Sequence, residues 1–385
     1  MSTKLLDKKQ KNQTFLILNG IAILLVILGH LDFRILTIGG LFPYYSFHVM
    51  VFAFVSGYFY KEEATEHPGR YLLHKAKGLL LPYMIWNLIY GLLAAGLRVA
   101  GFGFGDPINI RSLFLEPFLG GHQYALNFPS WFVPALFLVQ AVNLMGRKIF
   151  DLLPARANAF REMIILSGTL IVGILVVYLA QTGHVWGYYK TPGRILFMLP
   201  VFEMGVFYRK HLEKRDHVKW YIYFPVLLVI QIAIVKLCGG LAFSAVWVTS
   251  FGNLPFVPYL TTVTGIAFWL GIAKRLSESR SLSRLAGAVG TLGNHSFDLM
   301  MHHILGFFLW NECLCLMSAR GILPGFDREM FLTDVNYVYT GAGMATGLSE
   351  TLLRGAFLCI YTAFGIMIPL LIGGLQRWIQ KKIPG

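Results

Sequence analysis

The chain has 385 residues, of which 56% are hydrophobic and only 14% are charged, and its mean hydropathy is +0.61. Soluble domains carry about 25% charged residues, so this composition excludes an ordinary soluble enzyme. The formal net charge of +14 would suit nucleic-acid binding, but the basic residues are spread over short segments along the chain. We therefore expect no nucleic-acid partner.

Apolar runs long enough to cross a bilayer, about 20 residues each, recur along nearly the whole chain. They predict an all-α polytopic membrane protein with about ten transmembrane helices in a single domain over residues 1–385. The predicted helices span roughly 14–32, 41–60, 78–99, 130–146, 162–180, 194–209, 220–238, 255–273, 290–310 and 353–375. The apolar stretch Gly239–Phe251 is too short to cross alone, so we expect a re-entrant segment or an extension of its neighbour.

The distribution of basic residues predicts how the chain is oriented. With the N-terminus in the cytoplasm, the tail and the loops on that side hold 24 of the 33 Lys and Arg residues, and the opposite side holds nine. Cytoplasmic loops of membrane proteins carry such an excess. We therefore predict that both termini are cytoplasmic and that the basic clusters contact anionic headgroups of the lipid bilayer.

Three histidines lie within the predicted helices, where an ionisable group is costly and marks a functional site by default. At about 1.5 Å per residue, His30 lies about 24 Å along the first helix, toward the outer face. His48, on the second helix, lies about 10 Å below the outer surface, and His303, on the ninth, lies at a similar depth. Two interpretations remain open: a proton-transfer site, or histidines that pack helices through hydrogen bonds.

Metal binding is not expected, because the adjacent His302 and His303 should point to different faces of a helix and no other ligand spacing is present. Glu203, in the sixth predicted helix, is expected to face the protein interior. Two long outward loops, 100–129 and 311–352, carry carboxylates and aromatic residues. They either line an acceptor site or are solvated connections.

Two basic residues, Lys75 and Lys77, precede the third predicted helix at its cytoplasmic entrance. Their amines could bind phosphate groups as point charges. They could equally be anchors of the positive-inside kind.

Six strings of residues follow one another in an order that is similar to the acyltransferase-3 family of integral membrane acyltransferases. They are Gly20–His30, Ser46–Tyr58, Leu80–Tyr83, Ser130–Phe137, Leu199–Gly205 and Leu292–His303. The first resembles the opening span of the family, the second resembles its FHMPLFFFISGY-like motif, and the last resembles its late helix with a histidine. The overall pattern is closest to the fucose 4-O-acetylase-like branch.

The resemblance implies transfer of an acyl group, usually acetyl, from acyl-CoA to a carbohydrate hydroxyl at the bacterial inner membrane. It implies that His30 is the catalytic histidine, which either deprotonates the acceptor hydroxyl or carries the acyl group. His48 and His303 would position substrate or share protons. Lys75 and Lys77 would bind the donor, acetyl-CoA, although the family more often has arginine there.

One further position departs from the family pattern. Asn19 stands eleven residues before His30, where the family often has Arg or Lys. No fused soluble domain is expected after the last helix. The alternatives are a donor other than acetyl, such as succinyl, and a different class of protein, a transporter or flippase for a lipid-linked glycan.

Overall fold

The computed structural model describes residues 3–151, 160–239, 254–341 and 343–382, and in these ranges it contains helices and no strands. The all-α class is confirmed. Seven of the described helical segments are long and apolar enough to cross a membrane: Gln13–His30, Pro68–Val99, Ala125–Phe150, Arg161–Gln181, Trp220–Cys238, Ser296–Ala319 and Leu348–Lys382. The count of ten is not confirmed. From residue 240 on, the predicted Gly239–Phe251 segment lies outside the described residues.

Three predicted spans differ from these seven. Within 41–60, only α2 (Met50–Tyr58) is an α-helix, and nine residues extend only about 13 Å. Turns and a short 3₁₀-helix (Tyr44–Ser46) precede it. Helix α10 (Lys190–Phe207) contains three charged residues, and α12 (Val257–Glu278) is rich in threonine, so both are less apolar than the other spans.

The ninth predicted helix, 290–310, is in fact divided between two helices. Helix α13 covers Ser283–Asn294 and α14 covers Ser296–Ala319, with His295 between them in a non-helical conformation. Asp298 lies in the first turn of α14, where a carboxylate interacts favourably with the helix dipole. It accepts hydrogen bonds from His295 (3.2 Å) and Arg377 (2.8 Å), and these contacts stabilise the new helix start.

Packing divides the chain into two compact units, residues 1–25, 34–81 and 132–294 in the first and 26–33, 82–131 and 295–385 in the second. The prediction of one domain stays a prediction. The helices not yet named are α1 (Thr3–His30), α3 (Glu63–Glu66), α4 (Pro68–Lys75), α5 (Leu81–Val99), α6 (Glu116–Leu119), α7 (Phe132–Phe150), α9 (Arg161–Gln181), α11 (Trp220–Cys238), α15 (Arg328–Thr333) and α16 (Leu348–Lys382).

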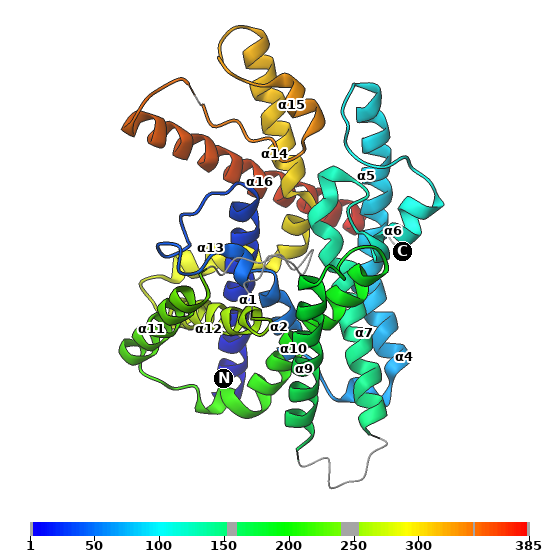
Figure 1. Cartoon of the computed structure of the whole chain (residues 1–385), viewed down its shortest axis with the longest axis vertical. Coiled ribbons are helices and arrows are strands. Elements are labelled where there is room, and N and C mark those ends of the chain that lie inside the picture. Colours follow the sequence, from blue (N-terminus) through cyan, green and yellow to red (C-terminus); the bar gives the residue numbers. More distant parts are fainter. Residues whose placement is uncertain (1–2, 152–159, 240–253, 342, 383–385) are drawn as a thin grey trace. The chain divides into compact units, whose positions relative to one another are not determined.

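In the first unit, α10 packs against α2, α7 and α9 (Figure 1). Two glycines allow the α2–α10 contact. A Cβ atom at Gly57 would lie 1.8 Å from the carbonyl oxygen of Phe202, and one at Gly205 would lie 2.0 Å from that of Phe54. Small residues permit such close backbone approach between membrane helices. The glycines of the Ser46–Tyr58 and Leu199–Gly205 strings are therefore packing residues.

In the second unit, α14 and α16 cross (Figure 1). A Cβ atom at Gly306 of α14 would lie 2.4 Å from the carbonyl oxygen of Phe364, so the two backbones are close there. Polar contacts lie on either side of this crossing: Arg377 pairs with Asp298, and the hydroxyl of Tyr361 donates to Asn311. This unit also contains the last turn of α1, which places His30 beside α14.

Candidate functional site

His30 is the last residue of α1, and the backbone fixes it there. The amide of Asp32 donates to the carbonyl of Gly29 (3.2 Å), and the amide of Phe33 donates to that of Leu28 (3.0 Å). Asp32 has φ 48°, so these bonds form a Schellman cap with aspartate at the left-handed position that glycine usually occupies. The cap ends the helix directly after the apolar run and presents His30 at its C-terminal end, where the helix dipole favours positive charge.

Two of the predicted catalytic histidines meet within the second unit. The ring centroids of His30 and His303 are 5.2 Å apart, and the rings are tilted by 36°. His303 is fully buried, whereas His30 is partly exposed. The pair therefore has one partly accessible ring and one ring that is enclosed by the protein.

Hydrogen bonding fixes the tautomer of neutral His303. Its Nδ1 lies 2.8 Å from the carbonyl oxygen of Leu299. A carbonyl only accepts, so Nδ1 carries the proton and Nε2 carries the lone pair. Nε2 is buried and, within the described part of the chain, has no hydrogen-bond partner. The rings next to His303 are those of His30 and Phe307, and of these only His30 can exchange a proton.

An aromatic residue that was not singled out from the sequence, Phe128, stands beside His30, and His122 lies behind it. Phe128 meets the His30 ring edge-on at 5.1 Å, and His122 lies 6.1 Å from Phe128. All three rings are partly exposed, although most residues around Phe128 are buried. His122 was recognised only as part of a long outward loop, because nothing in its local sequence indicates that the loop folds back onto α1.

The loop that carries these rings is held by α5. Buried Gln123 donates from Nε2 to Asn87 (2.6 Å) and to the hydroxyl of Tyr83 (3.2 Å). Asn87 in turn donates to the carbonyl of Leu113 (2.9 Å). Tyr83, from the Leu80–Tyr83 string, therefore helps to fix the position of the loop next to His30.

His302 faces a different side of α14 from His303, as expected for adjacent helical residues. Its Nδ1 is 2.8 Å from the hydroxyl of Tyr90, and its ring lies edge-on to Trp86 at 4.2 Å. These contacts join α14 to α5. His302 is therefore a packing histidine, which is the interpretation that the sequence left open for each of the buried histidines.

The prediction that His48 lies within a transmembrane helix is wrong. His48 lies in the turn that precedes α2, and its amide donates to the carbonyl of Tyr44 (3.0 Å). Its buried ring meets Tyr45 edge-on at 5.2 Å within the first unit. Its proposed role in positioning substrate stays a prediction.

Lys75 and Lys77 lie at the end of α4 and in the π-helical turn Ala76–Leu80 that follows. Pro82 provides the physical reason for the wider turn, because its ring would clash with the carbonyl four residues earlier in a regular α-helix. The Lys75 amine lies 5.5 Å above the Tyr71 ring, and Lys77 is exposed. Neither lysine pairs with a carboxylate among the described residues, so both charges are available to an anionic ligand or to headgroups.

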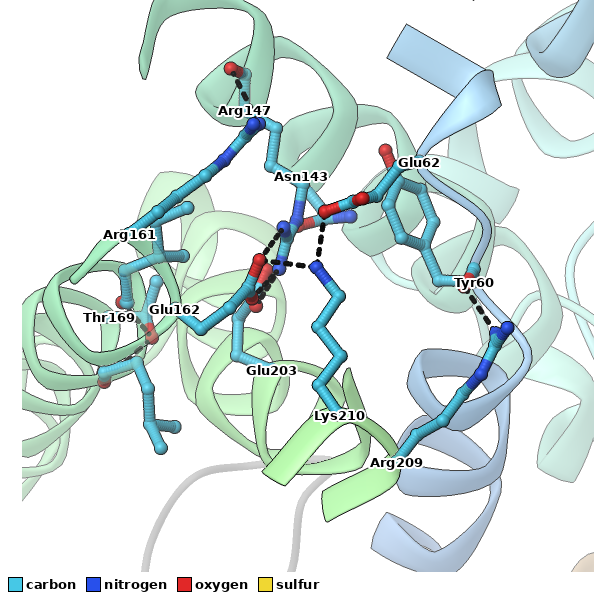
Figure 2. Close-up of polar contacts among 12 residues, drawn as sticks. Tyr60, Glu62, Asn143, Arg147, Arg161, Glu162, Thr169, Glu203, Arg209 and Lys210 are labelled. Carbon is cyan, nitrogen blue, oxygen red and sulfur yellow. Dashed lines mark hydrogen bonds and ion pairs between the residues drawn. The ribbon is translucent and has the colours of Figure 1, made fainter. Parts of the chain in front are cut away.

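An ion-pair network joins α7, α9 and α10 of the first unit to the segments that carry Glu62 and Lys210 (Figure 2). Arg147 of α7 forms two hydrogen bonds to Glu162 of α9 (2.9 and 3.0 Å) and a third to Glu203 of α10. Lys210 bridges Glu162 (2.6 Å) and Glu62. Arg147 and Glu203 are each 1% exposed. The network ties together the ends of the helices that pack around α10.

The network confirms one expectation and corrects another. Glu203 faces the interior, as predicted. Arg147 begins the connection between the predicted helices 130–146 and 162–180, which is one of the basic segments expected to contact headgroups, but it is buried and bound to carboxylates. Its partner Glu162 is 15 residues away in sequence and Glu203 is 56 away, so no local pattern indicates the pairing. At the edge of the network, the Lys210 ammonium lowers the pKa of Glu62 below its usual value.

Comparison with known proteins identifies the family. The model of the acyltransferase-3 family, described as an acyltransferase domain, matches residues 17–349, a range that includes both His30 and His303. No curated protein and no solved structure matches the chain. The fucose 4-O-acetylase-like branch stays a prediction. Because the match covers most of the sequence, the chain belongs to the acyltransferase-3 family of membrane acyltransferases.

Proposed function

We propose that this protein transfers an acetyl group from acetyl-CoA to a hydroxyl of a cell-surface or lipid-linked carbohydrate in a bacterial inner membrane. The observation that carries the proposal is the contact between His30 and His303 in a chain of this family. His30 is the reacting imidazole, and Lys75 and Lys77 bind the phosphates of the donor. Family membership does not favour the alternative of a transporter or flippase.

In the proposed reaction, His30 takes the proton of the acceptor hydroxyl while the hydroxyl oxygen attacks the thioester carbonyl carbon. The carbon–sulfur bond breaks, and the thiolate of CoA takes the proton back from the imidazolium. The C-terminal end of α1 stabilises the positive charge that develops on His30. The His303 ring, whose centroid lies 5.2 Å from that of His30, remains neutral, because a second buried cation next to the first would be costly.

A second route remains within the same proposal. His30 attacks the thioester itself, CoA leaves as the thiol, and the acetyl-imidazole then reacts with the acceptor hydroxyl. The two routes differ in whether label from acetyl-CoA stays on the protein when no acceptor is present. Purified protein is incubated with radiolabelled acetyl-CoA, quenched in SDS at neutral pH, where an acetyl-imidazole survives longer than in acid, and separated rapidly from free label. Label on the wild type and none on His30→Asn indicates the acyl carrier, and no label on either indicates the base.

The activity itself is tested with purified protein in nanodiscs. We expect acetyl-CoA to raise the thermal midpoint and to be hydrolysed slowly without acceptor, and we expect His30→Asn to abolish hydrolysis without lowering the midpoint. Lys75→Gln with Lys77→Gln should weaken binding of CoA and leave the rate at saturating donor unchanged. If no CoA compound changes the midpoint or is hydrolysed, the proposal fails.

A further inference from the structure

A cavity of about 290 Å³ in the first unit lies where α11 begins and α12 ends. Its wall is formed by the segment before α11, the first turn of α11 and the last two turns of α12. Trp220 is 54% exposed at the start of a candidate membrane span. Tryptophan at a span end marks the level of the lipid headgroups. The cavity therefore opens at the membrane surface.

The charges that line the cavity favour a phosphate group. Lys219, Lys274 and Arg275 contribute three positive charges, and Asp216 and Glu278 contribute two negative charges, which leaves an excess of one. Lys274 is already neutralised, because it pairs with Asp216 and bonds to the hydroxyl of Tyr208 (2.9 Å). The excess of one matches the single negative charge of a phosphate diester.

Two of the cations have no carboxylate partner among the residues that the structure describes. Lys219 lies 5.8 Å above the Tyr221 ring, and the guanidinium of Arg275 lies 5.3 Å above the Trp220 ring. Stacking on an aromatic ring holds each side chain in place without neutralising its charge. Arg275 and Lys219 are thus positioned on the cavity wall with their charges available to a ligand.

The surroundings favour a lipid over a soluble phosphate compound. Beyond the cavity, the exposed face of α11 is apolar, with Val226 50% and Val229 66% exposed. Acyl chains that continue from a headgroup would lie along this face. The cavity is also at the small end of ligand pockets, about 300–1,000 Å³, so it fits a headgroup better than a whole CoA molecule.

We propose that this cavity binds the phosphodiester headgroup of an anionic phospholipid, with Lys219 and Arg275 as the phosphate ligands. Gly271 lines the cavity, and a Cβ atom there would lie 2.7 Å from the ring of Tyr223, so a larger residue would displace this ring of the cavity wall. Neither Lys75 nor Lys77 lines this cavity, so the site does not share residues with the proposed donor site. Its existence does not depend on which acyl group the protein transfers.

The test is the thermal midpoint of the full-length protein in detergent, titrated with short-chain phospholipids. Dioctanoyl phosphatidylglycerol should raise the midpoint, and dioctanoyl phosphatidylcholine should do so much less. Lys219→Gln with Arg275→Gln should weaken the apparent affinity for phosphatidylglycerol about thirtyfold. Each basic charge near a headgroup contributes about 1 kcal/mol, and about 1.4 kcal/mol corresponds to a tenfold change in affinity. Both side chains are exposed, so the double variant should fold normally.

A matched control removes the same charge elsewhere. Lys381→Gln with Lys382→Gln also deletes two cations at the end of a candidate span, Leu348–Lys382, and Lys382 likewise lies 4.2 Å above a tryptophan ring, that of Trp378. This control should bind phosphatidylglycerol like the wild type. Equal loss in both double variants would show general surface attraction and overturn the proposal. The lipid assignment is overturned if glycerol 3-phosphate or CoA raises the midpoint to the same degree as the lipid and this effect is lost in the Lys219→Gln with Arg275→Gln variant.

Discussion

Replacement of Arg147 by methionine should destabilise the protein far more than the same replacement of an arginine in an exposed salt bridge. The guanidinium is 1% exposed and is shared by Glu162 and Glu203. Glu162 keeps Lys210 as a partner after the change, but Glu203 is left as a buried carboxylate whose cation has been removed. Removing one partner of a buried ion pair costs about 3–5 kcal/mol, and we expect a loss of that size for Arg147→Met.

The charge count of the network predicts a rescue. Two cations and three carboxylates give the native network a net charge of −1, and Arg147→Met changes it to −2. Glu203→Gln in the same chain returns the charge to −1. The double variant should therefore be more stable than Arg147→Met by about 0.5–3 kcal/mol, the usual coupling between contacting residues.

Equilibrium unfolding in mixed micelles of mild detergent and SDS measures these differences. Arg111→Met is the control. Arg111 also forms a salt bridge, with Glu116, but its side chain is 72% exposed. Such a surface pair contributes about 0–1 kcal/mol. The reasoning is refuted if Arg147→Met loses no more than Arg111→Met, or if the added Glu203→Gln lowers the stability further.

Three other changes test separate parts of the structure. Gly293→Ala would place a Cβ atom 1.8 Å from the carbonyl oxygen of Leu16 on α1, so it should lower the free energy of unfolding by about 1–3 kcal/mol. Gly290→Ala on the same helix is the control, because the nearest atom to its Cβ would be 3.9 Å away, and it should leave the free energy of unfolding unchanged. His303→Phe should reduce acetyl transfer about 10²-fold or more at an unchanged thermal midpoint, while His302→Phe should lower the midpoint and spare the rate, because it removes the partner of Tyr90. The pKa of Glu62 is lower in the folded state, so its pairing with Lys210 stabilises the protein above the unfolded pKa of about 4.3; the loss of stability in Glu62→Gln should be present at pH 7 and disappear as the pH falls through the folded pKa.

The sequence predicted the features that depend on composition and on helical geometry. A long apolar run is sufficient to identify a span such as 220–238, which matches α11 residue for residue. The different orientations of His302 and His303 follow from 100° per residue along a helix. The order of the six strings was sufficient to indicate the family. Each of these depends only on residues close together in the sequence.

Features that depend on tertiary contacts were missed. The span 41–60 has the hydrophobicity of a transmembrane helix, yet only Met50–Tyr58 is helical and His48 lies in a turn. Phe128 stands against His30 because a loop about 100 residues later in the sequence is held by Gln123 and α5. Arg147 resembles a loop anchor until its partners on two other helices are known. None of these pairings leaves a periodic signal in the chain.

The central claim is that His30, backed by His303, performs acyl transfer to a carbohydrate. The most direct measurement is the mass of the surface glycan from cells that lack the gene and are complemented with wild type, His30→Asn or His302→Phe. We expect the wild type and His302→Phe to add one acetyl unit per glycan repeat and His30→Asn, present in the membrane at the same level, to add none. Acetylation by His30→Asn at the wild-type level would contradict the account.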